Sequence, residues 1–335
     1  MRRIARRNAD DRTALFRNTA AKTGLSAAIV EKDFWVCWTL DQLFHRCPWS
    51  SSFVFKGGTS LSKGFDLIKR FSEDIDLILD WRILGYATDE PWRERSNTRQ
   101  DAFNEEANHR AAAFLAGELL PRLSQAFSDE LGTEAGLRID PDDPQTVKFA
   151  YPRTDSDPSI LQEIRMEIGA LAAWTPSAPR PISPYAASVY GALFEAPSTS
   201  VPTVLPERSF WEKATILHRE AFRAETGVVP ARYSRHYYDL WSMSGSDVCE
   251  HALAQPELLA QVVRFKAKFY RCPWARYDLA AKPSGLRLVP KPVHARALAA
   301  DYAHMRNMIF GTIPDFDTIL ARLERLQSQW AKRTD

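Results

Sequence analysis

Two short stretches of the sequence carry residues whose types and spacing suit nucleotide chemistry. Gly57-Gly58 lies between an apolar run and an expected helix. Two glycines there let the backbone approach an anionic ligand, with helix N–H groups facing it. Asp74 and Asp76 are two residues apart, so on a strand both carboxylates face one side, where they repel unless a cation lies between them. We therefore expect an NTP triphosphate at the glycines and Mg²⁺ at the aspartates.

The two stretches are more specific together than apart. A glycine turn or a pair of aspartates alone is a weak signal, because a structural turn followed by a solvated edge strand contains the same residues. In this order, with a short helix between them, they favour a nucleotidyl transfer site. Paired metal ions at such a site activate an attacking hydroxyl and stabilise the leaving pyrophosphate. The hydroxyls of Thr59 and Ser60 are further donors to the phosphates.

Other polar residues near the aspartates extend this candidate site. A third carboxylate for the metal is expected from the strand over 163–168, where Glu167 is the first choice and Glu163 the second. A solvent-exposed charge in an alternating strand gives the same pattern. Ser72 is expected to form a cap or a turn just before the aspartates. A phosphate on Ser72 would add negative charge beside two carboxylates and so oppose metal and NTP binding.

Basic residues are concentrated in the C-terminal part of the chain. Residues 1–200 carry 24 Lys and Arg against 28 Asp and Glu, whereas residues 201–335 carry 20 against 14. Within 261–300 there are nine basic residues and one acidic residue, and Phe269, Tyr270, Trp274 and Tyr277 are interleaved with them. A basic surface with aromatic faces suits a phosphate backbone and exposed bases, so the Arg264–Arg296 segment is a candidate RNA-binding surface. The alternative is the solvated side of packed helices.

Composition and missing motifs exclude several classes of protein. The chain of 335 residues, 45% apolar and 26% charged, is expected to fold into two domains or one domain with large helical additions. No apolar stretch is long enough for a membrane span and no apolar core follows the basic start, so a cytoplasmic protein is expected. The cysteines form no CxxC unit and the histidines no HxxxH spacing, which argues against zinc. No P-loop sequence occurs.

Periodicity and turn residues predict an α+β protein. A mixed sheet flanked by helices is expected in the N-terminal half, and mainly helices in the C-terminal half. Strands are expected at 53–55, 74–79, 146–150 and 162–168, with a turn over 152–159. Helices are expected at 12–46, 59–70, 98–128, 207–224, 234–243, 255–271, 295–309 and 315–331. The stretch 175–206, rich in Pro, Ser and Ala, is interpreted as a connection.

Several further motifs follow one another in a recognisable order. They are Glu31-Lys32-Asp33-Phe34, Trp211-Glu212-Lys213 with His218-Arg219, the segment Arg232–Leu240, and a closing segment from Asp301-Tyr302 to Met308-Ile309. Together with the glycine and aspartate motifs, this set resembles the polymerase-β-type nucleotidyltransferases, and more closely their AbiEii/AbiGii-type toxin branch. The resemblance spans roughly residues 25–325. His236 stands where the family frequently has Asp.

The resemblance implies a role for each matched residue. Asp74 and Asp76 would be catalytic metal ligands, with Glu167 as the third. Lys213 would be the family's essential lysine, a point charge on the triphosphate. Asp239 would be a catalytic base or a positioning group. The residues expected around the nucleotide are Lys56, Gly57, Gly58, Thr59, Ser60 and Ser72.

The resemblance also implies an architecture and a biological role. It implies a polymerase-β-like nucleotidyltransferase sheet over 51–205, with the helical segment 1–50 packed on it and the helical domain 206–335 completing the active-site cleft. It further implies the toxin of a type IV toxin–antitoxin pair, with a cognate antitoxin and a part in phage defence. The expected reaction is Mg²⁺-dependent transfer of NMP from an NTP to an acceptor, above all the tRNA 3′ end.

Three alternatives stay open at this stage. The acceptor could be a protein side chain, as in AMPylation, because only the basic segment favours RNA. The chain could also be a non-catalytic NTP-binding regulator, although intact Asp74, Asp76 and Lys213 argue against it. Within the N-terminal helix, Lys32 and Asp33 are expected to form a structural salt bridge, with Lys32 reaching the active site as the alternative.

Overall fold

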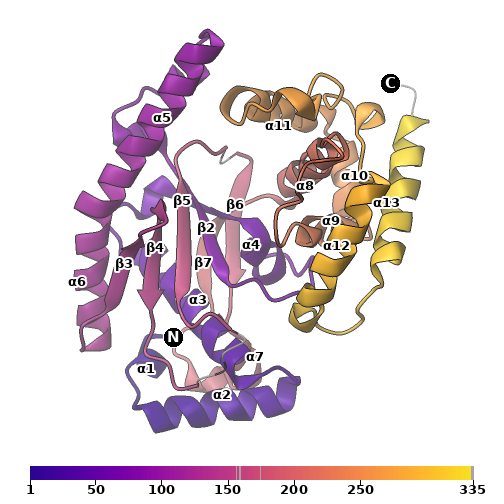
Figure 1. Ribbon diagram of the computed structural model, residues 1–335. Helices are drawn as coiled ribbons and strands as arrows, with labels where there is room; N and C mark the ends of the chain where they lie inside the picture. The colour runs from indigo at the N-terminus through magenta and orange to yellow at the C-terminus, as the bar shows by residue number, and fades with distance from the viewer. Residues whose placement is uncertain (156, 158–159, 174, 333–335) are drawn as a thin grey trace. The chain divides into compact units, whose positions relative to one another are not determined.

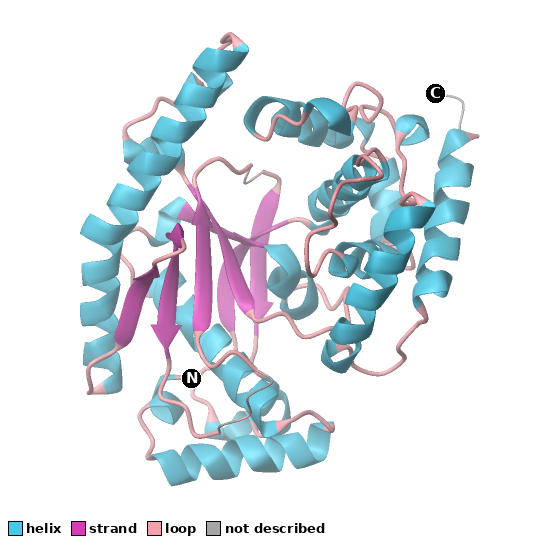
Figure 2. Ribbon diagram, viewed as in Figure 1, coloured by secondary structure: helices cyan, strands magenta, loops and turns pink. Residues whose placement is uncertain are grey.

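The computed structural model describes residues 1–332 except 156, 158, 159 and 174, and in this part of the chain seven strands form one mixed sheet (Figures 1 and 2). In their order across the sheet, the strands are β3 (Gly136–Asp140), β4 (Asp143–Ala150), β5 (Ile164–Gly169), β2 (Asp74–Leu79), β1 (Phe53–Lys56), β7 (Thr199–Val204) and β6 (Ser177–Ile182). The pairs β2–β5 and β1–β7 are parallel, and the other neighbours are antiparallel. The expected mixed sheet is confirmed.

The chain divides into two compact units. The first comprises Met1–Gly64 and Ser72–Val204 and contains the sheet. The second comprises Phe65–Phe71 and Leu205–Asp335 and, in its described part, is mainly helical. The short segment Phe65–Phe71 thus belongs to the same unit as residues that lie more than 130 positions later in the chain.

Alternation of polar and apolar residues gives the sheet two different faces. In β2, Ile75 and Leu77 are buried, whereas Asp74 and Asp76 are only partly buried. Ile75, Leu77 and Leu79 of β2 and the buried residues of β5 join a core that also contains residues of α3 (Ala27–His45). Trp38 of α3 stacks on a ring of β4, that of Phe149. One face is therefore closed by aromatic packing, and the carboxylates lie on the other.

The helices of the first unit surround this sheet. They are α1 (Arg2–Ala5), α2 (Ala9–Thr23), α3, α4 (Gly57–Lys63), α5 (Asn97–Phe114), α6 (Leu120–Leu131) and α7 (Tyr185–Val189). A π-helical turn, Leu115–Leu119, joins α5 to α6, and these helices lie along β4 and β3 (Figure 1). The helix expected over 98–128 is therefore confirmed. Short 3₁₀ helices occur at Ser50–Ser52, Trp81–Leu84, Glu90–Trp92 and Gly191–Leu193.

The single helix expected over 12–46 is wrong, because the chain forms two helices there. Gly24 has φ of 75° and ends α2 in the left-handed conformation, with its N–H donating to the carbonyl of Ala20. Ser26 then caps α3, its side chain accepting from the N–H of Ile29. A left-handed glycine followed by a serine cap is a standard helix stop and start, and the sequence contained both signals.

The helix expected over 59–70 is also wrong in its extent, because α4 ends at Lys63. The residues that follow bond instead within the second unit. The N–H of Phe71 donates to the carbonyl of Met308 at 2.7 Å, and the N–H of Phe310 donates to that of Lys69 at 2.7 Å. Backbone pairing with residues near 309 therefore replaces the helix, a long-range effect that local propensity does not contain.

The interpretation of 175–206 as a connection is wrong, because this stretch supplies β6, α7 and β7. β6 contains Pro179 and Pro181, which lack the N–H that a central strand needs. It is an edge strand of the sheet, where proline is tolerated. The expected turn over 152–159 includes residues 156, 158 and 159, which lie outside the described residues.

The second unit is built around two helices. Its helices are α8 (Pro206–Ala221), α9 (Ser234–Met243), α10 (Val248–Leu253), α11 (Pro256–Phe269), α12 (Pro292–Met305) and α13 (Phe316–Ala331). α8 contacts α9, α10 and α11, while α9 contacts α12 and α13. Short 3₁₀ helices occur at Pro273–Ala275, Pro283–Gly285 and Arg306–Met308. The five helices expected here are confirmed, and α10 was not predicted.

Two expectations from composition can be compared with the structure. Within the described residues, no helix is both long and apolar enough to cross a membrane. Within the described residues, Cys37, Cys47, Cys249 and Cys272 are in no disulfide bond.

Candidate active site

The register of the sheet places the predicted carboxylates on neighbouring strands. Asp76 of β2 lies opposite Lys56 of β1 on one side and Glu167 of β5 on the other. Asp74 lies opposite Arg165 of β5. Directly paired residues point to the same face, so the sheet gathers both aspartates, Lys56 and Glu167 on the face away from the aromatic core. Sequence spacing predicted the aspartate pair, and strand pairing adds its two neighbours.

The missing side chain of Gly57 leaves room for the carboxylate of Asp76. Gly57 has φ of 83°, a conformation that favours glycine, at the turn from β1 into α4. A Cβ at this position would lie 1.8 Å from Oδ2 of Asp76 and 2.5 Å from its Cγ. Because no atom pair tolerates that approach, only glycine leaves the Asp76 carboxylate where it is. The glycine motif therefore serves the aspartate motif directly.

The hydroxyls that follow Gly57-Gly58 have partners in the backbone. Thr59 Oγ1 donates to the carbonyl of Asp74 at 2.5 Å, which ties α4 to the start of β2. Ser60 Oγ donates to the carbonyl of Gly57 at 2.9 Å. Both side chains are buried. The two hydroxyls thus hold the glycine turn against the aspartate strand.

Arg165 lies among the carboxylates of this face. Its Nη2 is 3.6 Å from Oε1 of Glu167, its Nε is 3.9 Å from Oδ1 of Asp74, and its Nη1 donates to Asp140 at 2.9 Å. Sequence reasoning missed Arg165, although its position between Glu163 and Glu167 in an alternating strand put it on this face. The guanidinium supplies a fixed positive charge between Asp74 and Glu167.

The donor set suits a small hard cation held by two carboxylates. Among the described residues, no group of three or more His, Cys, Asp and Glu side chains is arranged to hold a metal ion. Mg²⁺ is usually held by one or two carboxylates together with substrate phosphates and water. Asp74 and Asp76 fit that pattern, with Oδ2 of Asp76 facing the space that Gly57 leaves open.

Glu31, Lys32 and Asp33 of α3 anchor three different segments around this face. Glu31 accepts from the N–H groups of Thr154 and Asp155. Lys32 Nζ lies 2.7 Å from Oε2 of Glu73, the residue before Asp74, and donates to the carbonyl of Leu161 at 2.5 Å. Asp33 accepts from Lys63 Nζ at 2.6 Å and from the N–H of Tyr185 at 2.6 Å.

The expected salt bridge between Lys32 and Asp33 is therefore wrong. Adjacent residues of a helix point in different directions and do not face each other. Lys32 is fully buried and bonds to the residue next to the candidate metal ligands, while Asp33 holds the last residue of α4. Through these two ion pairs, α3 holds both the residue before Asp74 and the end of α4.

Replacing Lys32 with methionine should destabilise the protein by about 3–5 kcal/mol, because Glu73 would lose the partner of a buried ion pair. Thermal melting of K32M against wild type measures this loss. The K32M/E73M variant should recover much of it, since an apolar pair replaces the ions. K69M, which removes an exposed lysine paired with Asp66, is the control and should melt like wild type. If K32M has the same melting temperature as K69M, the ion pair of Lys32 with Glu73 does not stabilise the fold.

In the second unit, Lys213 and Asp239 form one buried cluster with Arg70. Asp239 Oδ2 is 2.8 Å from Lys213 Nζ and accepts from Arg70 Nη2 at 2.9 Å, while Oδ1 accepts from Arg70 Nε at 2.7 Å. Asp239 is fully buried. Sequence reasoning missed Arg70, which lies 169 residues before Asp239 and was placed at the end of an expected helix.

Charges within this cluster decide its protonation states. Burial alone would raise the pKa of Asp239, but the charges of Arg70 and Lys213 outweigh it and hold that pKa below its ordinary value. Burial lowers the pKa of Lys213, against the attraction of Asp239. An ionised carboxylate with two cations is a weak base, which favours the positioning role of Asp239 over the role of a catalytic base.

His236 is the neutral neighbour of this cluster. Its Nδ1 lies 3.2 Å from Lys213 Nζ. Burial, together with the positive charge of Lys213, lowers the pKa of His236 well below its ordinary value. Because the ammonium donates, Nδ1 accepts and the ring proton lies on Nε2. His236 therefore provides Lys213 with a neutral acceptor.

Replacing Asp239 with asparagine should cost about 3–5 kcal/mol near neutral pH, because two buried cations lose their counter-ion. The ionised Asp239 contributes stability above its unfolded pKa of 3.8, and that contribution is lost as pH falls toward the lowered folded pKa. The stability gap between wild type and D239N should therefore narrow by about 1.4 kcal/mol per pH unit below 3.8. Denaturant titrations from pH 7 to 2.5 measure it, and a constant gap would contradict the ionised cluster.

The basic segment Arg264–Arg296 divides into exposed and buried residues. Tyr270 and Trp274 are exposed, whereas Phe269 and Tyr277 are buried. Arg264 and Arg271 are exposed as well. Lys266 Nζ instead donates to the carbonyl of Glu212 in α8 at 3.0 Å, which gives that lysine a structural contact. Tyr270 and Trp274 therefore face solvent, Phe269 and Tyr277 belong to the core, and RNA binding by this segment stays a prediction.

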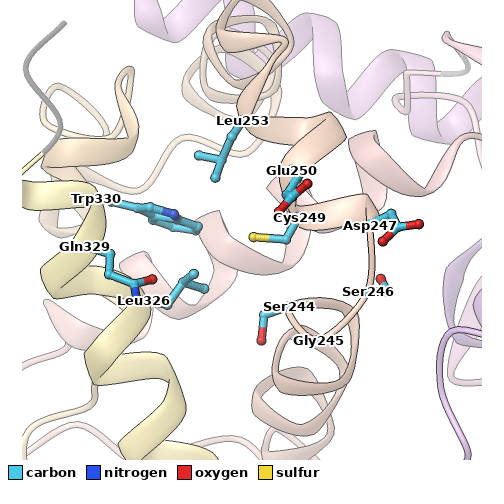
Figure 3. Close-up of a pocket in the computed structure, with 10 residues that line it drawn as sticks. All are labelled: Ser244, Gly245, Ser246, Asp247, Cys249, Glu250, Leu253, Leu326, Gln329 and Trp330. Atoms are coloured by element: carbon cyan, nitrogen blue, oxygen red, sulfur yellow. The ribbon is translucent and has the colours of Figure 1, made fainter.

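A separate cavity of about 520 Å³ lies in the second unit (Figure 3). Its lining comes from the loop after α9, from α10 and from the end of α13: Ser244, Gly245, Ser246, Asp247, Cys249, Glu250, Leu253, Leu326, Gln329 and Trp330. None of the residues singled out for nucleotide chemistry lines it.

Comparison with known proteins identifies a sequence family and similar solved structures. A sequence model of the family described as nucleotidyl transferase AbiEii toxin, type IV TA system, matches residues 38–322. Among solved structures, MenT4, a nucleotidyltransferase toxin from Mycobacterium tuberculosis H37Rv, is similar at 16% sequence identity and a TM-score of 0.44, over 95% of this chain and 98% of the MenT4 chain. No curated protein matches the sequence.

Proposed function

This chain belongs to the AbiEii family of nucleotidyl transferase toxins of type IV toxin–antitoxin systems, and from that premise we propose that it transfers NMP from an NTP to an RNA 3′ end, in the first place that of tRNA, with Mg²⁺. The observation that carries this proposal is the Asp74/Asp76 pair beneath the Cβ-free turn of Gly57. Membership of the family means that the chain is a nucleotidyltransferase with an NTP substrate and an antitoxin partner. Mg²⁺, RNA and a role in phage defence are our proposals.

The residues of the first unit have distinct roles in this proposal. Asp74 and Asp76 hold Mg²⁺, which when bound supplies charge stabilisation to the phosphate oxygens. The turn at Gly57-Gly58 gives the triphosphate close access to the backbone. Lys56, paired in register with Asp76, adds positive charge on the same face. Glu167 is the third carboxylate of this face, with Arg165 between it and Asp74.

The cluster of the second unit supplies a positioned cation. Lys213 acts as a point charge on phosphate oxygens, and Asp239 fixes its ammonium through an ion pair of 2.8 Å. Arg70 in turn fixes Asp239 from the other side. Asp239 is therefore a positioning residue in this proposal. In-line displacement depends mostly on such positioning and on charge stabilisation.

Labelling of cellular acceptors tests the proposal. Purified protein is incubated with each α-³²P-NTP, Mg²⁺, bacterial RNA and lysate, with the D74A/D76A variant as control. Label in tRNA-sized RNA that is absent from the control is the expected result, and it names the preferred base. Label on protein bands would replace RNA by protein as the acceptor. No label with any NTP, set against metal-dependent NTP binding by wild type, would favour the regulator.

The exposed part of the basic segment should carry RNA affinity. Replacing Arg264 and Arg271 with glutamine should weaken RNA binding and make the slope of log Kobs against log salt shallower by about 1.4, because two phosphate contacts are lost. Lys266 is left intact because of its bond to α8. R325Q, which removes one exposed arginine of α13, is the control. Filter binding at several salt concentrations measures both, and an unchanged slope in R264Q/R271Q would remove this segment from the RNA interface.

A further inference from the structure

A small basic pocket in the second unit lies beside the Asp239 cluster. Its volume is about 150 Å³. Three arginines, Arg70, Arg232 and Arg235, line it together with His304, Met305 and Met308. A cavity of this size has room for a phosphate group.

The carboxylates near the pocket are already engaged. Asp301, which also lines it, accepts from the N–H of Arg232 at 2.6 Å and from the N–H and hydroxyl of Ser234 at 2.9 and 2.5 Å. Asp239 is bound by Arg70 and Lys213. The half-buried guanidinium of Arg235 forms no hydrogen bond or ion pair with any part of the chain that the structure describes. Arg235 therefore has its five donors available for a ligand.

Positive charge exceeds negative charge around this pocket. The charge of Arg235 contributes to lowering the pKa of both Lys213 and His236. Arg70 and Lys213 already contact the buried carboxylate of Asp239, and Arg235 is a further cation at the pocket. An excess of fixed cations in a partly dry site stabilises a bound anion.

Arg232, one of the pocket residues, has a strained backbone conformation. Arg232 has φ of 62°, a left-handed conformation that is costly for a residue with a Cβ. The bond from its N–H to Asp301 fixes this conformation immediately before α9, which carries Arg235 in its first turn. Such strain persists only where the surrounding contacts determine it, and it concentrates at ligand-binding sites.

We propose that Arg232, Arg235 and His304 form a binding site for one phosphate group, whose remaining ligand atoms lie outside the pocket. The guanidinium of Arg235 donates in a fork to two phosphate oxygens. His304, whose Nδ1 donates to the carbonyl of Ala300 at 2.9 Å, offers only its Nε2 at the rim. Met305 and Met308 provide apolar contact to atoms next to the phosphate. This site goes beyond the proposed transfer reaction, because it needs neither Asp74 nor Asp76.

Inorganic phosphate is the first probe. Thermal melting of the full chain is measured in rising phosphate against chloride at equal ionic strength. Wild type and R325Q should gain melting temperature with phosphate, and R235Q should need about ten- to a hundredfold more phosphate for the same gain. R235K should lie between them, since it keeps the charge but loses the fork. Equal phosphate dependence in wild type and R235Q would overturn the proposal, provided that R235Q melts cooperatively without phosphate. If R235Q does not melt cooperatively, H304Q replaces it under the same criterion.

Two further arms identify the source of the phosphate. Binding of ATP and of a single-stranded RNA oligonucleotide is measured without Mg²⁺ for wild type, R235Q and R325Q. Weakened RNA binding by R235Q assigns the pocket to the polynucleotide, and weakened ATP binding assigns it to the NTP. If R235Q binds both ATP and RNA as tightly as wild type, the pocket does not bind the phosphate of a nucleotide, and its assignment to a nucleotide ligand is overturned. Wild-type transfer of label is scored separately, so absent transfer with intact phosphate binding would sink the proposed function alone.

Discussion

The D76N variant should lose about a thousandfold in nucleotidyl transfer while folding at least as well as wild type. Asp76 carries one of the two carboxylates proposed for Mg²⁺, and losing several kcal/mol of charge stabilisation in the transition state gives a rate loss of that order. Stability should not fall, because the substitution also removes repulsion from Asp74 on the same face. Transfer of α-³²P label under initial-rate conditions, together with a thermal melt, measures both effects.

A matched substitution makes the D76N result specific. D142N changes an exposed aspartate in the turn between β3 and β4 and should leave both rate and melting temperature unchanged. E167Q tests the third carboxylate in the same assay. A loss near that of D76N assigns Glu167 to the metal, whereas a loss below tenfold leaves it as the partner of Arg165. Transfer by D76N within tenfold of wild type would refute the metal site itself.

The G57A variant should lose transfer to a similar degree and should also be destabilised. Its Cβ would come within 1.8 Å of Oδ2 of Asp76, so either the carboxylate or the turn must move. The left-handed φ of 83° adds about 1–2 kcal/mol of backbone strain for any residue with a Cβ. The displacement of the Asp76 carboxylate lowers the transfer rate, and the backbone strain lowers the stability. A shift of the turn would also reduce the access of the triphosphate to the backbone. Initial rates and denaturant titrations measure them separately.

Gly85 provides the control for G57A. It has φ of 87°, close to that of Gly57, but a Cβ there would meet no atom within 4 Å. G85A should therefore show the backbone strain of about 1–2 kcal/mol and keep wild-type transfer. If G57A and G85A lose the same stability and the same activity, the absence of a Cβ next to the Asp76 carboxylate does not matter for transfer. A selective loss in G57A ties the glycine motif to the carboxylate.

Several elements of the fold were predictable from local sequence patterns alone. The strand over 74–79 was predictable, because its alternation places both carboxylates on one face whatever the rest of the chain does. The helices α8, α9 and α13 were predictable from their apolar spacing for the same reason. The break at Gly24 was present in the sequence as a helix stop followed by a serine cap, and was overlooked.

Long-range pairing explains the expectations that failed. β6 has two prolines and a weak strand pattern, and it exists because its neighbour β7 supplies the ladder. Residues after Lys63 leave the helical conformation because their backbone bonds to residues near 309. Lys32 pairs with Glu73 rather than with Asp33, since adjacent helical side chains diverge. In each case the deciding partner is distant in sequence.

The sequence by itself determined the candidate site of this protein, namely two carboxylates on one strand face and a glycine turn before them. It also determined the ordered set of motifs by which the family is identified. These are properties of residue type and short spacing, which local backbone geometry converts directly into a site. Tertiary structure alone decided what surrounds them. Arg165 lies among the carboxylates through strand register, Arg70 reaches Asp239 across 169 residues, and the basic pocket closes around Arg235. Buried charges need partners, and only the folded chain can bring partners from so far apart.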